Sequence, residues 1–200
     1  MDKKAVDVVL LPDEEMTRAA IQANTILVEK FGEKIVLNKE NCLPHISLAM
    51  GCIDESEVGD IGKVLEDVAG RTSVKLLSIS ELEISTTSSG EKVSAFSIEK
   101  TNELQLLHEE VMETAGEYFR YDVSSEMLYG SEKIAESTLH WIKNYRDKSG
   151  FDNFWPHITI GYGVLDNFKF SRTFTAKRLA LCHLGNHCTC RVILTSVEIQ

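Results

Sequence analysis

Apolar residues recur along the chain with two spacings, and each spacing predicts one kind of secondary structure. Short runs rich in β-branched residues predict strands, whereas apolar positions three and four residues apart predict helices with one buried face. The predicted strands cover residues 6–11, 35–37, 44–51, 74–84, 92–98, 156–162, 170–184 and 189–199. The predicted helices cover residues 12–32, 56–69, 101–115 and 131–145. Strands and helices mixed in this way predict an α+β fold.

Residues with strong capping or turn preferences mark the ends of several of these elements. Asp13 and Thr101 stand at predicted helix starts, where a side-chain oxygen can accept a hydrogen bond from a free backbone N–H group. Ser88-Ser89-Gly90 separates two strands of a predicted hairpin, and Gly185-Asn186 is a predicted two-residue turn. Each half of the chain places a helix, a proline and a histidine-containing strand in the same order. This order indicates an internal duplication within a single domain that covers residues 1–200.

Two tetrapeptides of one pattern, one in each half, open predicted strands. They are Pro44-His45-Ile46-Ser47 and Pro156-His157-Ile158-Thr159, in a chain with only three prolines. Alternate side chains of a strand face the same side, so each histidine shares a face with the hydroxyl residue two positions later. Proline at the first position of a strand removes no ladder hydrogen bond that the strand needs. A third His-x-Thr triplet, His187-Cys188-Thr189, lacks the proline, and we interpret the first two as a repeated functional design.

Charge is unevenly distributed along the chain. The formal net charge of −10 argues against a broad, sequence-independent grip on long nucleic acid. Residues 167–200 nevertheless contain five basic residues and a single acidic one. The basic residues are Lys169, Arg172, Lys177, Arg178 and Arg191. A basic segment close to the second motif could attract a phosphate, although solvated side chains at strand edges explain these residues equally well.

Apolar run lengths and cysteine usage restrict the compartment that we expect. No apolar run is long enough to span a bilayer, and we predict no membrane association. Residues 5–11 are too short for a signal peptide and contain Asp7. Five cysteines, an odd number without a secretory signal, predict reduced thiols and a cytoplasmic protein. The sequence shows no sign of a stable protein partner.

The paired motifs resemble those of the two-histidine (2H) phosphoesterase superfamily, in its branch of 2′-5′ RNA ligase-like proteins and cyclic phosphodiesterases. The resemblance covers nearly the whole chain in element order, and the tetrapeptides are its specific part. It implies a bilobal fold with two antiparallel β-sheets, pseudo-twofold symmetry and helices packed outside. It also implies an active-site cleft between the lobes, with the two motifs facing each other.

By this resemblance, His45 and His157 are the catalytic pair, and Ser47 and Thr159 hold the phosphate. Opening a 2′,3′-cyclic phosphate on a nucleotide or RNA 3′-end needs one group that takes a proton from water and one that gives a proton to the leaving ribose oxygen. Imidazole can do either near neutral pH. We assign His45 as the acid and His157 as the base, although the symmetry of the motifs leaves the opposite assignment open. No Asp/His cluster at metal-ligand spacing adjoins either motif, so we expect no metal and no other cofactor.

Three alternatives remain open from the residues. The chain could join RNA ends as a 2′-5′ ligase by the reverse chemistry. It could act on a cyclic phosphate that is not on RNA. It could also be a nucleotide- or RNA-binding module without catalysis, although two proton-transfer groups are not needed for binding alone.

Several other residues carry chemistry that the motifs do not use. Tyr162 and Trp155 could stack on a base, and Arg191 could lie near the phosphate, although strand-flanking aromatics are more often core. The stretch Cys182–Cys190 contains several possible metal ligands close together in sequence. A two-residue turn would pair His183 with Cys188 and would divide the possible ligands between the two faces of the hairpin. We therefore expect buried thiols there rather than a metal. His108 and His140 lie in predicted helices, where we expect partly exposed or core-edge side chains without a catalytic role.

Overall fold

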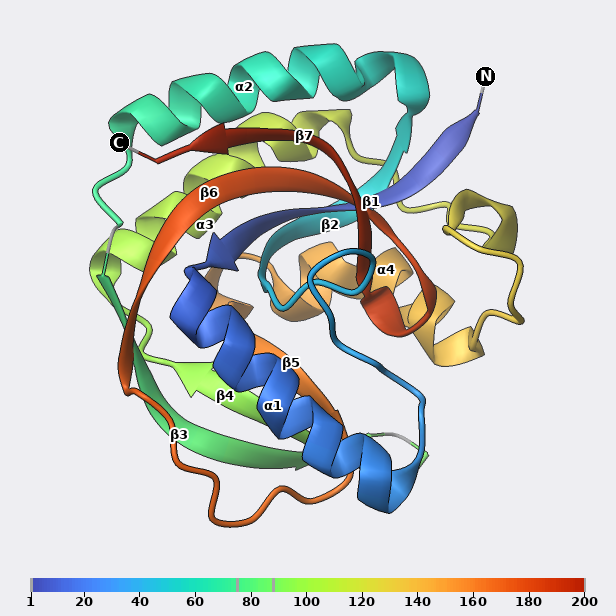
Figure 1. Ribbon diagram of the computed structural model, residues 1–200. Coiled ribbons are helices and arrows are strands. Elements are labelled where there is room, and N and C mark those ends of the chain that lie inside the picture. The colour runs from blue at the N-terminus through green and yellow to red at the C-terminus, as the bar shows by residue number, and fades with distance from the viewer. Residues whose placement is uncertain (1, 75, 88, 200) are drawn as a thin grey trace.

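The computed structural model describes residues 2–74, 76–87 and 89–199, and confirms the mixed α+β class (Figure 1). Within these residues the strands are β1 (Lys3–Pro12), β2 (Ile46–Asp54), β3 (Leu76–Thr86), β4 (Lys92–Ile98), β5 (His157–Tyr162), β6 (Thr173–Leu184) and β7 (Cys190–Glu198). The α-helices are α1 (Glu14–Phe31), α2 (Val58–Arg71), α3 (Asn102–Thr114) and α4 (Glu136–Ser149). Ser88, in the predicted hairpin turn, and Lys75, in the predicted strand 74–84, lie outside the described residues. No helix among the described residues combines the length and the apolar composition that crossing a membrane would need.

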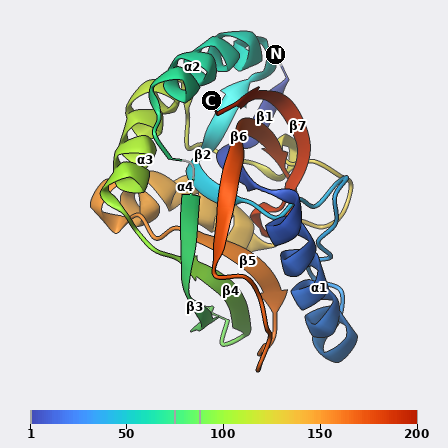
Figure 2. The same cartoon turned by 60° about the vertical axis from the view of Figure 1, so that its left-hand side comes forward.

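All strand pairs are antiparallel, and they form one sheet rather than the two separate sheets that we expected. The strand order is β2-β1-β6-β3-β4-β5, with β7 also paired to β6. The start of β6 pairs with β3, whereas its later residues pair with β1 and β7. Figure 2 shows β6 passing from the upper half of the sheet to the lower half. Because one long strand serves both halves, the two motif strands, β2 and β5, stand at opposite ends of the strand order.

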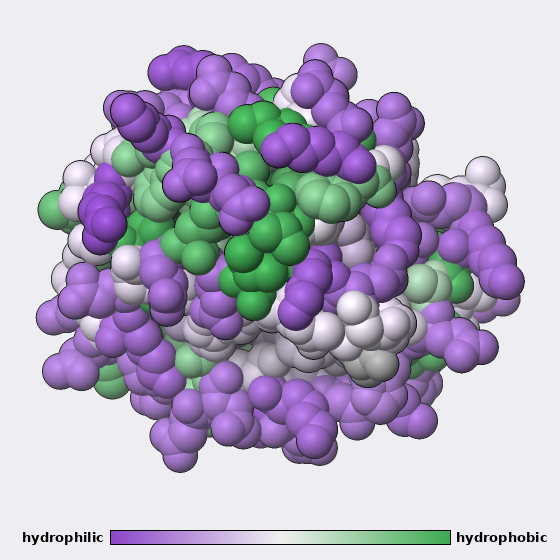
Figure 3. Space-filling model, turned by 90° about the horizontal axis from the view of Figure 1, so that it is seen from below, coloured by the Kyte–Doolittle hydropathy of each residue, from purple (hydrophilic) through white to green (hydrophobic). Residues whose placement is uncertain are grey.

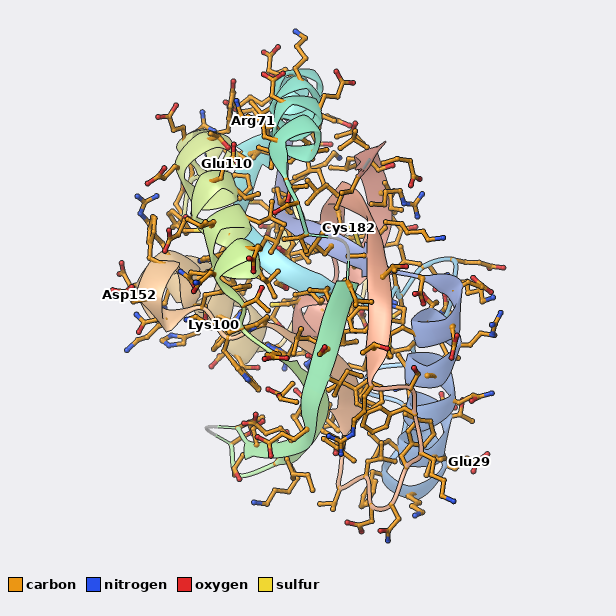
Figure 4. The ribbon with its side chains drawn as sticks, turned by 90° about the vertical axis from the view of Figure 1, so that its left-hand side faces the viewer. Glu29, Arg71, Lys100, Glu110, Asp152 and Cys182 are labelled. Carbon is orange, nitrogen blue, oxygen red and sulfur yellow. A yellow bond between two sulfur atoms is a disulfide. The ribbon has the colours of Figure 1, made fainter. Side chains whose placement is uncertain are left out.

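The helices pack around the sheet through the apolar stripes that the sequence predicts. Helix α1 packs against β5, α2 against β6 and β7, and both α3 and α4 against β2. Figure 4 shows Arg71 at the end of α2 beside Glu110 of α3, with an Nη2–Oε1 distance of 2.6 Å. Both predicted caps are confirmed, because Asp13 accepts a hydrogen bond from the Met16 amide and Thr101 accepts one from the Leu104 amide.

Two predicted elements differ from the structure for tertiary reasons. Residues 35–37 are not a strand, because the buried Asn24 side chain donates to Ile35 O and accepts from Leu37 N in place of a strand partner. The last helix starts at Glu136 rather than at residue 131. Its N-terminal turn is bounded by Asn186, whose Oδ1 accepts hydrogen bonds from the Ala135 amide and the Thr138 hydroxyl.

The connection between β6 and β7 also differs from the predicted two-residue turn. A short 3₁₀ turn covers Asn186–Cys188, and His187 and Cys188 both have left-handed φ angles. His183 therefore lies opposite Val192, so the predicted pairing with Cys188 is wrong. This register brings the Cα atoms of Cys182 and Cys190 to 5.5 Å, and the two residues form a disulfide. The expectation that every cysteine is reduced is wrong for this pair.

Hydrophilic side chains cover most of the surface, but some large apolar side chains are also exposed. Seen from below, where β3, β4 and the end of α1 lie, hydrophilic side chains surround a central apolar area (Figure 3). Exposed large apolar side chains of the described residues include Phe31, Leu76, Ile84, Leu106 and Trp141.

Candidate active site

The two motif strands come together around one cleft of about 1190 Å³. His45 and Ser47 of the first motif and His157 and Thr159 of the second all line it. The structure thus brings together all four residues that the motifs predict.

The two motif histidines are held in the same way. Nδ1 of His45 lies 2.8 Å from Leu43 O, and Nδ1 of His157 lies 2.9 Å from Trp155 O, in each case the carbonyl two residues earlier. A carbonyl oxygen only accepts, so each Nδ1 carries the hydrogen and each neutral ring keeps a free lone pair on Nε2. Both rings are therefore set to take or give a proton through Nε2.

Burial makes the charged form of both rings unfavourable. Burial, with a smaller contribution from a charge on His157, lowers the pKa of His45 to about 4, and the hydrogen bond to the Leu43 carbonyl opposes this in part. Burial also lowers the pKa of His157. An anion bound between the rings would raise both pKa values, because an opposite charge stabilises the imidazolium.

Asp7, on β1, is a member of the site that the sequence analysis missed. Its side chain is fully buried, and its Oδ2 accepts a hydrogen bond of 2.6 Å from Ser47 Oγ. The same oxygen lies 3.9 Å from His45 Nε2. Burial raises the pKa of Asp7 well above its usual range, and the Ser47 hydrogen bond opposes this only in part. The available signal was that Asp7 is the one acidic residue in the otherwise apolar predicted strand over residues 6–11.

The second motif has an aromatic neighbour instead of a carboxyl group. The Trp155 ring stacks on the His157 ring with 4.0 Å between centroids, and its Nε1 donates to Ser97 Oγ at 3.0 Å. Trp155 also lines the cleft. The two matching tetrapeptides thus lie in different surroundings.

Each motif strand has a register shift directly after its hydroxyl residue, and a buried side chain from the other half of the chain fills the gap. Leu48 has no opposite residue in β1, and its carbonyl accepts a hydrogen bond of 2.7 Å from His108 Nδ1 of α3. Ile160 has none in β4, and its carbonyl accepts a hydrogen bond of 2.7 Å from Asn24 Nδ2 of α1. Each side chain therefore satisfies a carbonyl that the sheet leaves free.

His108 is fully buried, so the prediction of a partly exposed or core-edge side chain is wrong. Its Nε2 accepts a hydrogen bond of 2.8 Å from the Phe151 amide, which lies just before the second motif. Since Nδ1 donates and Nε2 accepts, the ring is neutral, and burial lowers its pKa to about 4. Lys100 supports the same segment by donating to the carbonyls of Asp152 and Phe154, and Figure 4 shows Lys100 beside Asp152.

Among the predicted substrate-lining residues, Tyr162 lies in the cleft and Arg191 does not. The Tyr162 hydroxyl is 3.2 Å from His187 Nδ1, and the Lys34 ammonium lies 4.7 Å from the Tyr162 ring centre. Arg191 instead lines a neighbouring hollow of about 410 Å³ with Arg178 and Tyr129. Leu43 lines both cavities, so the hollow adjoins the cleft at the residue that binds His45.

The cysteine and histidine residues of the β6–β7 connection make other contacts in the structure. Cys182 and Cys190 are bonded to each other, and His183 Nε2 lies 3.0 Å from Met127 O. Across residues 2–74, 76–87 and 89–199, no three His, Cys, Asp or Glu side chains are arranged to hold a metal ion. His140, exposed at the cleft edge, lies beside Asn144.

The fold and site together define an antiparallel α+β protein with two histidine strands facing a common cleft. The fold is similar to that in the crystal structure of E. coli LigT in apo form, with a TM-score of 0.52. The likeness covers 99% of this chain and 98% of LigT at 13% sequence identity, and at this identity it shows the fold. No model of a known protein family matches the chain. No curated protein matches its sequence.

Proposed function

We propose that the protein is a phosphodiesterase that opens 2′,3′-cyclic phosphates, or related 2′-linked phosphodiesters, on nucleotides or RNA ends. The observation that carries this proposal is the pair of imidazoles held alike, each with a free Nε2 in one cleft. The resemblance of both tetrapeptides to the two-histidine phosphoesterases supports it. The fold shared with LigT supports the same class of enzyme.

The proposed reaction uses the two rings on opposite sides of one phosphate. His157 Nε2 takes a proton from water as the water oxygen bonds to phosphorus. The bond from phosphorus to one ribose oxygen breaks, and His45 Nε2 gives its proton to that oxygen. The products are a phosphomonoester and a free ribose hydroxyl, and proton exchange with solvent restores both rings. General acid and base groups of this kind contribute about 10² to 10⁴ in rate each.

The hydroxyls and aromatics of the cleft have separate proposed tasks. Thr159 donates to a phosphoryl oxygen, where negative charge builds up in the transition state. Ser47 faces the same phosphate, although its hydroxyl donates to Asp7 Oδ2 in the structure. Trp155 and Tyr162 offer faces on which a nucleobase can stack. No metal takes part in this scheme.

The direct test is turnover by the purified protein. Nucleoside 2′,3′-cyclic phosphates, ADP-ribose cyclic phosphate and a cleaved tRNA with a cyclic end are separate substrates, and chromatography resolves their products. We expect hydrolysis of at least one substrate, with EDTA having no effect. Joining of RNA ends would favour the ligase alternative, because the same acid–base pair can serve the reverse reaction. Tight binding without turnover between pH 5 and 8 would refute catalysis and favour a binding module.

A further inference from the structure

The two motifs hold their histidines alike, but only one histidine has a carboxyl group beside it. We infer that Asp7 is a positioning residue that keeps a proton next to His45 and so makes His45, rather than His157, the proton donor. This inference rests on the proposed function and deepens it. It resolves an assignment that the symmetry of the motifs leaves open.

Asp7 lies between β6 and β2, and His45, Ser47 and Met50 at the start of or on β2 line the cleft. It lies in the middle of β1, opposite Met50 of β2 and Cys182 of β6. Its Oδ2 reaches Ser47 Oγ at 2.6 Å and lies 3.9 Å from His45 Nε2. This separation is too long for a direct hydrogen bond but short enough for a strong charge interaction in a buried site. Its Oδ1 is buried and has no hydrogen-bond partner among the described residues.

The other groups that face Asp7 leave His45 as its cationic partner. Ser47 and His45 face it from β2, Tyr145 from α4 and Cys188 from the turn before β7. Burial and the nearby Asp7 raise the pKa values of Tyr145 and Cys188, so both stay neutral near pH 7. An ionised Asp7 would therefore be balanced only by a protonated His45 among the described residues that face it.

Burial acts on the two partners in opposite directions. It raises the pKa of Asp7 and lowers that of His45, and these opposite shifts favour a neutral pair in which the carboxyl group holds the proton. A neutral pair also admits an anion more readily than a lone carboxylate would, because like charges repel. When phosphate enters, it stabilises an imidazolium. One proton then leaves the Asp7 carboxyl group and one binds His45 Nε2, so the net charge of the pair does not change.

His157 has no equivalent source of a proton. Its ring stacks on Trp155 and donates to the Trp155 carbonyl, Ser97 lies opposite it in β4, and no described carboxyl group forms an ion pair with it. His157 therefore stays neutral and free to accept a proton from water. The difference between the roles of His45 and His157 therefore comes from Asp7 on β1 and not from the motifs themselves.

The first experiment compares pH profiles of kcat/KM for wild type and Asp7→Asn on a nucleoside cyclic phosphate. Asparagine keeps the size of the side chain but removes its proton and charge. We expect the basic limb to move to lower pH by about one unit or more, and activity at pH 7.5 to fall about tenfold or more. The acidic limb, set by His157, should not move. Asp122→Asn, which removes an exposed carboxyl group, is the matched control and should leave both limbs in place.

The second experiment needs neither turnover nor a variant. In wild-type protein with ¹³C-labelled aspartate and ¹⁵N-labelled histidine, NMR follows the titration of Asp7 and His45 with and without inorganic phosphate. We expect phosphate to move the Asp7 midpoint to lower pH and the His45 midpoint to higher pH. An unmoved Asp7 signal, or a basic limb unchanged in a folded Asp7→Asn protein, would overturn the inference while leaving hydrolysis itself intact. Absence of turnover with coupled titrations would instead refute only the proposed function.

Discussion

The half of the cleft built on β2 and the half built on β5 hold their histidines by the same hydrogen bond but surround them with different groups. His45 has the Asp7 carboxyl group 3.9 Å away, whereas His157 has the stacked Trp155 ring. The comparison teaches that a repeated motif fixes the orientation of a catalytic group, while neighbouring strands fix its protonation. Five predictions test how far the two halves are alike and where they differ.

Loss of either imidazole is expected to have the largest effect. His45→Ala and His157→Ala should each lower kcat on a cyclic nucleotide by about 10² to 10⁴, because each removes one proton-transfer group. The pH profiles should differ, since His157→Ala removes the acidic limb and His45→Ala removes the basic limb. His140→Ala, at the exposed edge of the cleft, is the matched control. Full activity of His157→Ala would exclude the two-histidine mechanism.

Substitution of His108 or Asn24, which support the two register shifts, should lower the stability of the fold more than the rate of the reaction. His108→Leu and Asn24→Leu each leave backbone groups unpaired in the core, which costs about 1–3 kcal/mol for each group. Urea unfolding measures the change, with His140→Leu as an exposed control. Equal stability of His108→Leu and wild type would show that the Leu48 carbonyl does not need this partner.

His108 should also make stability depend on pH. Its folded pKa of about 4 lies below the unfolded value of about 6.5, so the unfolded chain binds more protons between these values. Stability is therefore fully present above about pH 6.5 and falls as pH drops toward 4, by about 3 kcal/mol for this group. Urea unfolding at pH 7 and pH 5 should show a smaller loss in His108→Leu than in wild type.

Removal of the two motif hydroxyls should have smaller effects on the kinetics, and these effects should differ between the motifs. Thr159→Val removes a free donor to the phosphate and should raise KM or lower kcat about tenfold. Ser47→Ala removes a hydroxyl whose hydrogen is bound to Asp7, so its effect on KM should be only about two- to threefold. Steady-state kinetics on one cyclic nucleotide decides the order. A KM effect of Ser47→Ala as large as that of Thr159→Val would show that both hydroxyls hold the phosphate equally.

The smallest effect is expected at Arg191. Its guanidinium lies in the adjoining hollow, paired with Glu132 at 3.3 Å, and outside the lining of the cleft that contains both motif histidines. Arg191→Gln should change kcat/KM on a cyclic mononucleotide less than about twofold, because a partly exposed ion pair contributes little. A tenfold loss would place Arg191 on the substrate after all.

Sequence reasoning succeeded where the cause is local and failed where it is tertiary. The motif strands, the Asp13 and Thr101 caps and the shared face of each histidine and hydroxyl follow from strand periodicity and capping, which involve residues close in the chain. Asp7 could not be assigned to the site because its position depends on the pairing of β1 with β2. The Cys182–Cys190 disulfide and the continuous β6 likewise depend on register, which a single residue of slip changes.

The sheet leaves the Leu48 and Ile160 carbonyls free, and the way they are satisfied has a consequence for how the molecule assembles. A helix from the first half completes the second motif strand, and a helix from the second half completes the first, across sequence separations of 136 and 60 residues. Neither half can finish its own strand in isolation. A chain severed between the halves should yield fragments that are incompletely ordered alone and regain structure only on mixing. For the same reason, the intact protein should unfold in one cooperative step.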